Sequence, residues 1–321
     1  MFKVRLLKSN ALILVFSLIF SAFSLISCGD GEKAAHSETS VTFTDAMGRE
    51  ITVERNPERV AALIGSFADV WMLAGGKLCA SADDAWDDFG LDMGDAVNIG
   101  ATKSPNTELL LASDPDFVLA SASTAANVEM KGLLESAGIT VAYFDVDSFE
   151  DYLEMLKICT DITGRGDLYE KNGTKVKEKI DSLMTDFDME KLPEGERSVL
   201  FLRASAGYIR AKNNSGTVLG EMLSDLGAVN IADSEESLLE NLSIEKIIEL
   251  DPHKIFIVQV GDDSDAVKDN VGRMMDENPA WKSLSAVKEG RVYYLDKNLF
   301  NLKPNARWSE AYEKLCSIFT K

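Results

Sequence analysis

The chain has 321 residues, of which 45% are hydrophobic, and a formal net charge of -20. This length is enough for two hydrophobic cores of ordinary domain size. So acidic a chain argues against nucleic acid as a partner and against broad docking on anionic lipid.

The N-terminal residues 1–27 have the pattern of a secretory signal peptide rather than of a membrane-spanning helix. Basic residues precede an apolar run at 11–26, and Cys28 follows that run. Residues 28–40 are mostly small and polar, which suits a flexible tether. The sequence Leu-Ile-Ser-Cys that ends at Cys28 resembles the lipobox of bacterial lipoproteins. That resemblance implies a lipid on the Cys28 sulfur; the alternative is an uncleaved anchor with an incidental cysteine.

Residues 41–165 alternate between strand-like and helix-like segments, which predicts an N-terminal α/β lobe with a mostly parallel sheet. Residues 83–88 form an unusual acidic loop around Trp86. The expected elements are a hairpin at 41–53, strands at 59–64, 78–81, 117–120 and 140–146, and helices at 67–73, 107–113, 128–137 and 149–162.

Residues 167–187 are predicted to form one unbroken helix at the middle of the exported chain. Their apolar side chains recur at spacings that keep them on one stripe, and charged residues cover the other faces. Such a helix is about 30 Å long, the width of a small domain. We therefore expect residues 166–190 to connect two lobes, with the function in the cleft between them.

The C-terminal residues 191–321 repeat the alternation and predict a second α/β lobe. The expected elements are strands at 199–203, 208–212, 255–260 and 292–295, with helices at 218–226, 244–250 and 306–319. The fold class predicted is thus α/β, with two Rossmann-like lobes joined by one long helix.

An internal repeat links the two halves. A glutamate, Glu108 in the first half and Glu245 in the second, follows a helix-capping residue by two positions and precedes an Asp-Pro pair and a buried strand. Proline ends each helix because it lacks an amide donor and restricts the residue before it. Each lobe thus carries a carboxylate in the first turn of equivalent helices. The simplest alternative is that both glutamates only complement helix dipoles.

Several motifs together resemble one family, the helix-linked substrate-binding proteins of ABC importers for ferric siderophores, haem and cobalamin. They are the lipobox, the hairpin with its DAMGREITV sequence, the paired Glu…Asp-Pro units and the mid-chain helix. The resemblance implies a lipid-anchored, monomeric binding protein on the outer face of the bacterial cytoplasmic membrane. It also implies that Glu108 and Glu245 dock on arginines of the permease, which works with an ATPase, and that the ligand is an iron chelate. No resident cofactor is implied; haem or a corrinoid is the alternative ligand.

Candidate ligand-binding residues follow from the expectation that open α/β sheets bind ligands at the carboxyl ends of their strands. Arginine suits the negative charge of ferric catecholates and carboxylates, and tryptophan can stack on a ring. Two residues of these types have an equally simple structural explanation. Trp308 could belong to the hydrophobic core, and Arg210, on a predicted hairpin, could point into solvent. The candidates are Ser66, Trp86, Ser123, Arg203, Tyr208, Gln259, Arg307 and Trp308.

A bare metal ion is improbable as the ligand, because the chain has two histidines, His36 and His253, and metal importers use histidine clusters. The motifs of serine hydrolases, zinc proteases and nucleotide-binding loops are missing, so an enzyme is not predicted. An exported carboxylate-based hydrolase and a sensor lipoprotein stay open as other classes.

Overall fold

The computed structural model describes residues 39–261 and 263–321, and the compact unit begins at Thr39. The predicted signal peptide, the predicted lipidation site Cys28 and nearly all of the predicted tether lie outside these residues. The first strand begins at Ser40, the last residue of that predicted tether. Within the described part of the chain, no helix has the length and apolar character needed to cross a membrane.

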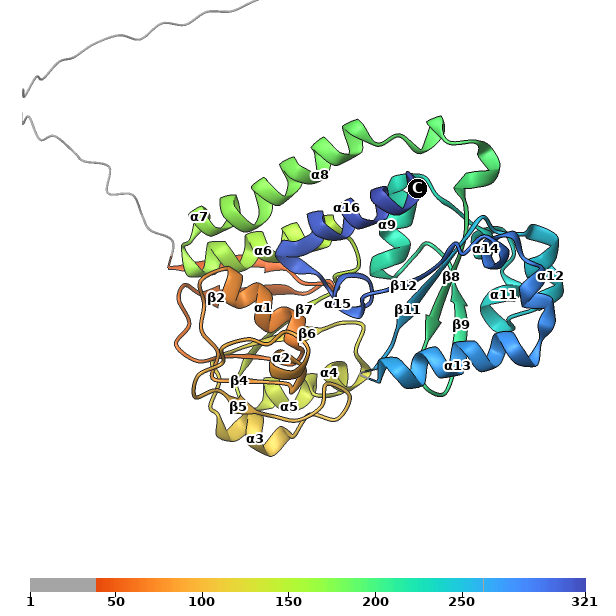
Figure 1. Cartoon of the computed structure of the whole chain (residues 1–321). Helices are drawn as coiled ribbons and strands as arrows, with labels where there is room; N and C mark the ends of the chain where they lie inside the picture. The colour runs from red at the N-terminus through yellow and green to blue at the C-terminus, as the bar shows by residue number, and fades with distance from the viewer. Residues whose placement is uncertain (1–38, 262) are drawn as a thin grey trace, which may run out of the picture. The chain divides into compact units, whose positions relative to one another are not determined.

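The N-terminal lobe is built on a parallel five-stranded sheet with the strand order β5-β4-β3-β6-β7 (Figure 1). Its central strand β3 and the adjoining strand β6 are buried along their whole length, as expected for a sheet covered on both faces. The strands are β3 Val60–Ala62, β4 Ala80–Ser81, β5 Val97–Asn98, β6 Phe117–Ser121 and β7 Thr140–Phe144. The helices are α1 Gly65–Leu73, α2 Asp84–Asp87, α3 Thr107–Ala112, α4 Ala125–Glu129, α5 Lys131–Ser136 and α6 Phe149–Thr163.

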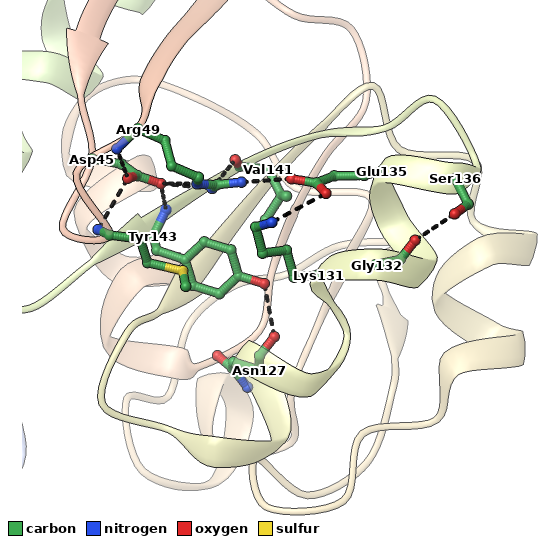
Figure 2. A network of polar contacts seen from close by, with 10 residues as sticks. Asp45, Arg49, Asn127, Lys131, Gly132, Glu135, Ser136, Val141 and Tyr143 are labelled. Carbon is green, nitrogen blue, oxygen red and sulfur yellow. Dashed lines mark hydrogen bonds and ion pairs between the residues drawn. The ribbon is translucent and has the colours of Figure 1, made fainter.

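A hairpin of β1 (Ser40–Thr44) and β2 (Glu50–Glu54) is fixed to this lobe by a polar network at its turn (Figure 2). The buried carboxylate of Asp45 accepts hydrogen bonds from Arg49 Nη2 at 2.6 Å and from the Tyr143 amide at 3.2 Å. Arg49 also donates to Glu135 at 2.7 Å. The predicted hairpin is confirmed, and its turn is anchored on strand β7 and helix α5.

The C-terminal lobe has a sheet with the order β10-β8-β11-β12, and β9 pairs antiparallel with β8. Its strands are β8 Ser198–Ala204, β9 Ile209–Lys212, β10 Val229–Asn230, β11 Lys254–Gln259 and β12 Val292–Leu295. Its helices are α9 Val218–Leu226, α10 Ile231–Ser234, α11 Ser237–Glu240, α12 Ile244–Leu250, α13 Ser264–Glu277, α14 Ser285–Lys288, α15 Lys297–Phe300 and α16 Trp308–Phe319. The predicted fold class, two α/β lobes with mainly parallel sheets, is confirmed.

The connecting segment is helical from Gly166 to Asp186, but it is not one uniform α-helix. Helix α7 (Gly166–Tyr169) continues into a π-helical turn, Glu170–Thr174, and then into α8 (Lys175–Asp186). The wider π turn adds one residue, which accounts for the gap of eight between Leu168 and Val176 in the apolar stripe. The prediction of one unbroken α-helix is therefore corrected: two α-helical segments are joined by a π-helical turn.

A second connection joins the lobes beside this helix. One hydrophobic core extends from the N-terminal lobe to the C-terminal lobe, and α16 packs against α8 (Figure 1). Trp308 at the start of α16 lies 6.0 Å from the Phe149 ring of α6. Just before α16, the Asn305 amide donates to the Ser66 carbonyl and to the Asp69 carboxylate, each at 2.8 Å. The closing segment thus returns to the N-terminal lobe.

Several segments differ from the sequence prediction. Residues 84–87 of the predicted acidic loop form helix α2, and the predicted helix 128–137 is divided between α4 and α5. Helix α13, with its N-cap Asp263 and buried Val267 and Val271, was not predicted.

Candidate ligand-binding site

A pocket of about 210 Å³ lies between the two lobes. The N-terminal lobe contributes residues that follow β6 and β7, and Arg203 lies near the carboxyl end of β8. The pocket is therefore outside the carboxyl ends of parallel strands, where open α/β sheets generally bind ligands. Its lining residues are Ser123, Asp147, Phe201, Arg203, Gly216, Thr217, Val218, Phe300, Asn301 and Lys303.

The C-terminal side of the pocket is cationic. Arg203 donates from Nη2 to Asn301 Oδ1, whereas its buried Nε has no hydrogen-bond partner. Arg210 stands opposite Arg203 across the β8–β9 pair. Lys212 lies on β9 together with Arg210. Burial, together with the charges of Arg203 and Arg210, lowers the pKa of Lys212. An unpaired guanidinium nitrogen beside like charges favours a negatively charged ligand.

The N-terminal end of α9 also lines the pocket. Thr217 caps this nine-residue helix by accepting from the Gly220 amide at 3.2 Å, and Glu221 accepts from the Gly216 amide at 2.8 Å. The positive end of the helix dipole therefore adds to the charge of Arg203.

The N-terminal side of the pocket is acidic, and two ion pairs cross from one lobe to the other. Lys303 Nζ lies 3.0 Å from an Asp147 oxygen, and Lys297 Nζ lies 2.5 Å from an Asp88 oxygen. Burial and the neighbouring Asp147 raise the pKa of Asp145, next to the same pocket. The two faces of the cleft are thus complementary in charge.

The structure brings two of the eight predicted ligand-binding residues, Ser123 and Arg203, into this pocket. Tyr208 lines another pocket, of about 450 Å³, within the C-terminal lobe. The Gln259 amide bonds to the Gly261 carbonyl, and Arg307 pairs with Glu310 at the surface.

The other three predicted residues lie in or against the core. Ser66 is buried in α1, and Trp86 is half-buried against the hydrophobic core. Trp308 has no exposed surface and packs on Phe149 and Tyr312. The structure therefore places Trp308 in the core, as the alternative to ligand contact expected.

Sequence reasoning missed Asp147, Thr217 and Lys303 as pocket residues. Thr217 carried a signal, because a threonine directly before an apolar helical pattern is a typical N-cap. Lys303 carried no such signal, because nothing in the sequence distinguished its ammonium from those of the chain's other lysines. Asp147 is paired with it across 156 positions of sequence, a separation that no local pattern encodes.

The paired glutamates lie on equivalent local structures. Glu108 and Glu245 are both exposed in the first turn of a helix, α3 and α12, whose caps are Asn106 and Ser243. The aspartate before each proline adopts a left-handed conformation, with φ of 49° at Asp114 and 34° at Asp251. The sequence repeat is therefore also a structural repeat, while the docking role of the glutamates stays a prediction.

In the described residues, no three histidine, cysteine, aspartate or glutamate side chains form a group able to hold a metal ion. Two α/β lobes with a charged pocket at their strand ends define a binding protein that holds a small molecule between lobes.

The family profile described as "Periplasmic binding protein" matches residues 60–299, and the chain belongs to this family. The resemblance found in the sequence is thereby confirmed.

Two relatives from Bacillus subtilis (strain 168) match over nearly the whole chain. The Fe(3+)-citrate-binding protein YfmC is 25% identical over 319 residues, which are 97% of this chain and 95% of the relative. An uncharacterized ABC transporter substrate-binding lipoprotein, YvrC, is 23% identical over 93% of this chain and 94% of its own.

Solved structures share the fold. SirA from Staphylococcus aureus, complexed with staphyloferrin B, has a TM-score of 0.68 and 22% identity, covering 87% of this chain and 98% of SirA. Staphylococcus aureus IsdE, complexed with heme, has a TM-score of 0.63 and 19% identity, covering 82% of this chain and 99% of IsdE. At these identities the likeness concerns the fold alone.

Proposed function

We propose that this protein is the extracytoplasmic substrate-binding component of an ABC importer and that it captures a ferric chelate with anionic groups between its lobes. The observation that carries the proposal is the cationic side of the inter-lobe pocket, where Arg203 has a buried Nε without a partner. Lys303 and the N-terminal end of α9 reinforce that charge. Charge-assisted hydrogen bonds from arginine to carboxylate or catecholate oxygens are strong and directional.

The relatives support the same assignment. One relative is named for ferric citrate and another as an ABC transporter substrate-binding lipoprotein. Lipidation at Cys28 would hold this protein at the outer face of the membrane. Glu108 and Glu245 would then present one carboxylate per lobe to basic residues of the permease, since both are exposed.

Haem is the second candidate ligand, because a haem-bound protein shares the fold. His253, the one histidine in the described residues, lies in the turn before β11, at the amino end of that strand. The pocket lies at the carboxyl ends, so a haem iron there would take an oxygen or sulfur ligand instead.

A fluorescence titration tests the proposal. Ferric citrate, ferric staphyloferrin B, haem and a corrinoid are added in turn to the exported part of the chain, which contains all four tryptophans. We expect saturable quenching by at least one anionic ferric chelate and none by the corrinoid. Tight binding of haem with no binding of ferric chelates would replace the iron-chelate assignment, and no binding by any compound would refute it.

A further inference from the structure

One pocket residue has a charge opposite to that of the cationic wall. Asp147 lies in the pocket between the lobes, and its carboxylate is 3.0 Å from Lys303 Nζ. Both side chains are largely shielded, with 28% of Asp147 and 19% of Lys303 exposed. An anionic ligand that reaches Lys303 must therefore compete with a carboxylate that the protein itself supplies.

We propose that Asp147 is a specificity-determining residue: its carboxylate holds the position on Lys303 that an anionic group of the ligand takes over. The inference rests on the proposed function and deepens it. A chelate with a free carboxylate that displaces Asp147 compensates Lys303 for the lost partner, whereas a neutral chelate that separates the Asp147–Lys303 pair does not. Breaking a shielded ion pair without a replacement is unfavourable, so the pair discriminates against neutral chelates.

The other positively charged or positively polarised groups of the pocket are held differently, and this singles out Lys303. Arg203 is bonded to the neutral Asn301, and its Nε has no partner. The amide of Gly216 at the end of α9 is bonded to Glu221, which belongs to the same helix rather than to the other lobe. Asp147 and Lys303 thus form the one ion pair among the pocket-lining residues, and it joins the two lobes.

Asp147 has an acidic neighbour that shares its surroundings. The pKa of Asp145 is raised by burial and by Asp147, and it is lowered by Ser123 and Lys303. Neutralising Asp147 therefore leaves one carboxylate within the influence of Lys303. We expect the substitution to weaken the competition rather than to abolish it.

The test uses the dissociation constants of ferric citrate and ferric staphyloferrin B, with a neutral ferric trihydroxamate as the third probe. Asp147→Asn should bind the anionic chelates about fivefold more tightly, as expected for the loss of one partly shielded ion pair. Lys303→Met should bind them more weakly. In the double variant, Asp147→Asn should have no further effect, because the cation for which it competes is gone. Asp95→Asn, the same change at an exposed residue of another pocket, is the control.

The double variant separates competition from a general change of charge. If Asp147→Asn strengthens anion binding equally with and without Lys303, the effect is long-range electrostatics and the inference is overturned. An unchanged dissociation constant for Asp147→Asn, with normal binding by the unmodified protein, also overturns it while leaving the proposed function intact. If the unmodified protein binds neither anionic chelate, the proposed function fails first and this inference fails with it.

Discussion

Replacing Arg203 by methionine tests the cationic wall of the inter-lobe pocket. The substitution keeps most of the apolar length of the side chain and removes its charge and its hydrogen-bond donors. Arg203 is tied to the protein by a hydrogen bond to Asn301, and its Nε has no partner, so donor capacity is left for a ligand. Hydrogen bonds to charged groups contribute about 1.5–3 kcal/mol each. One such bond to the chelate therefore predicts a loss of affinity of about 10- to 150-fold.

The assay is titration of the best-bound ferric chelate, with thermal unfolding measured in parallel. We expect little change in the unfolding temperature, because Arg203 makes no ion pair in the described structure. Arg273→Met is the matched control, since Arg273 is exposed and lines the pocket around Tyr208 instead. Unchanged affinity in Arg203→Met together with weakened binding in Arg273→Met would refute the reasoning and place the ligand in the other pocket.

Two further predictions concern transport and stability. Glu108→Ala combined with Glu245→Ala should abolish chelate uptake in cells while leaving the dissociation constant of the purified protein unchanged; normal uptake by the double variant would contradict the docking role. Burial, with the nearby charges of Asp88 and Asp83, raises the pKa of Asp84 to about 6 from its ordinary value of 3.8. The folded state thus holds the Asp84 proton more tightly than the unfolded state does, so protonation of Asp84 stabilises the fold. This contribution is complete below about pH 4 and is lost as the pH rises through 6. Asp84→Asn, which can still accept from the Gly65 amide, should raise stability at pH 8 by up to about 3 kcal/mol and have little effect at pH 4. Equal unfolding temperatures at pH 8 would show that the Asp84 carboxylate carries no such penalty.

Much of the fold could be predicted from sequence because it depends on local patterns. Helices 218–226 and 244–250 and the strand 292–295 were predicted at the observed bounds, since capping residues and glycine or proline mark their ends. Helix α13 was missed although its N-cap and its buried valines follow the same rules. The π turn at 170–174 was not predicted either, because the apolar stripe continues across it.

The site was less predictable because its contacts are not local. Arg203 and Ser123 could be predicted, since residues at strand ends gather at one edge of a parallel sheet. The ion pair of Asp147 and Lys303 depends on how the two lobes contact each other, and the hydrophobic periodicity of the sequence contains no information about that contact. Trp308 begins an amphipathic helix, and the packing of that helix on α8 and α6 decides that its ring is in the core.

The most direct test of the central claim is a crystal structure of the protein with a bound ferric chelate, with the iron located by its anomalous scattering. We predict that the iron lies between the lobes and that chelate oxygens are within hydrogen-bond distance of Arg203 and Lys303. An iron site in the pocket beside Tyr208, or on the outer surface of either lobe, would contradict the claim that the cargo is held between the lobes.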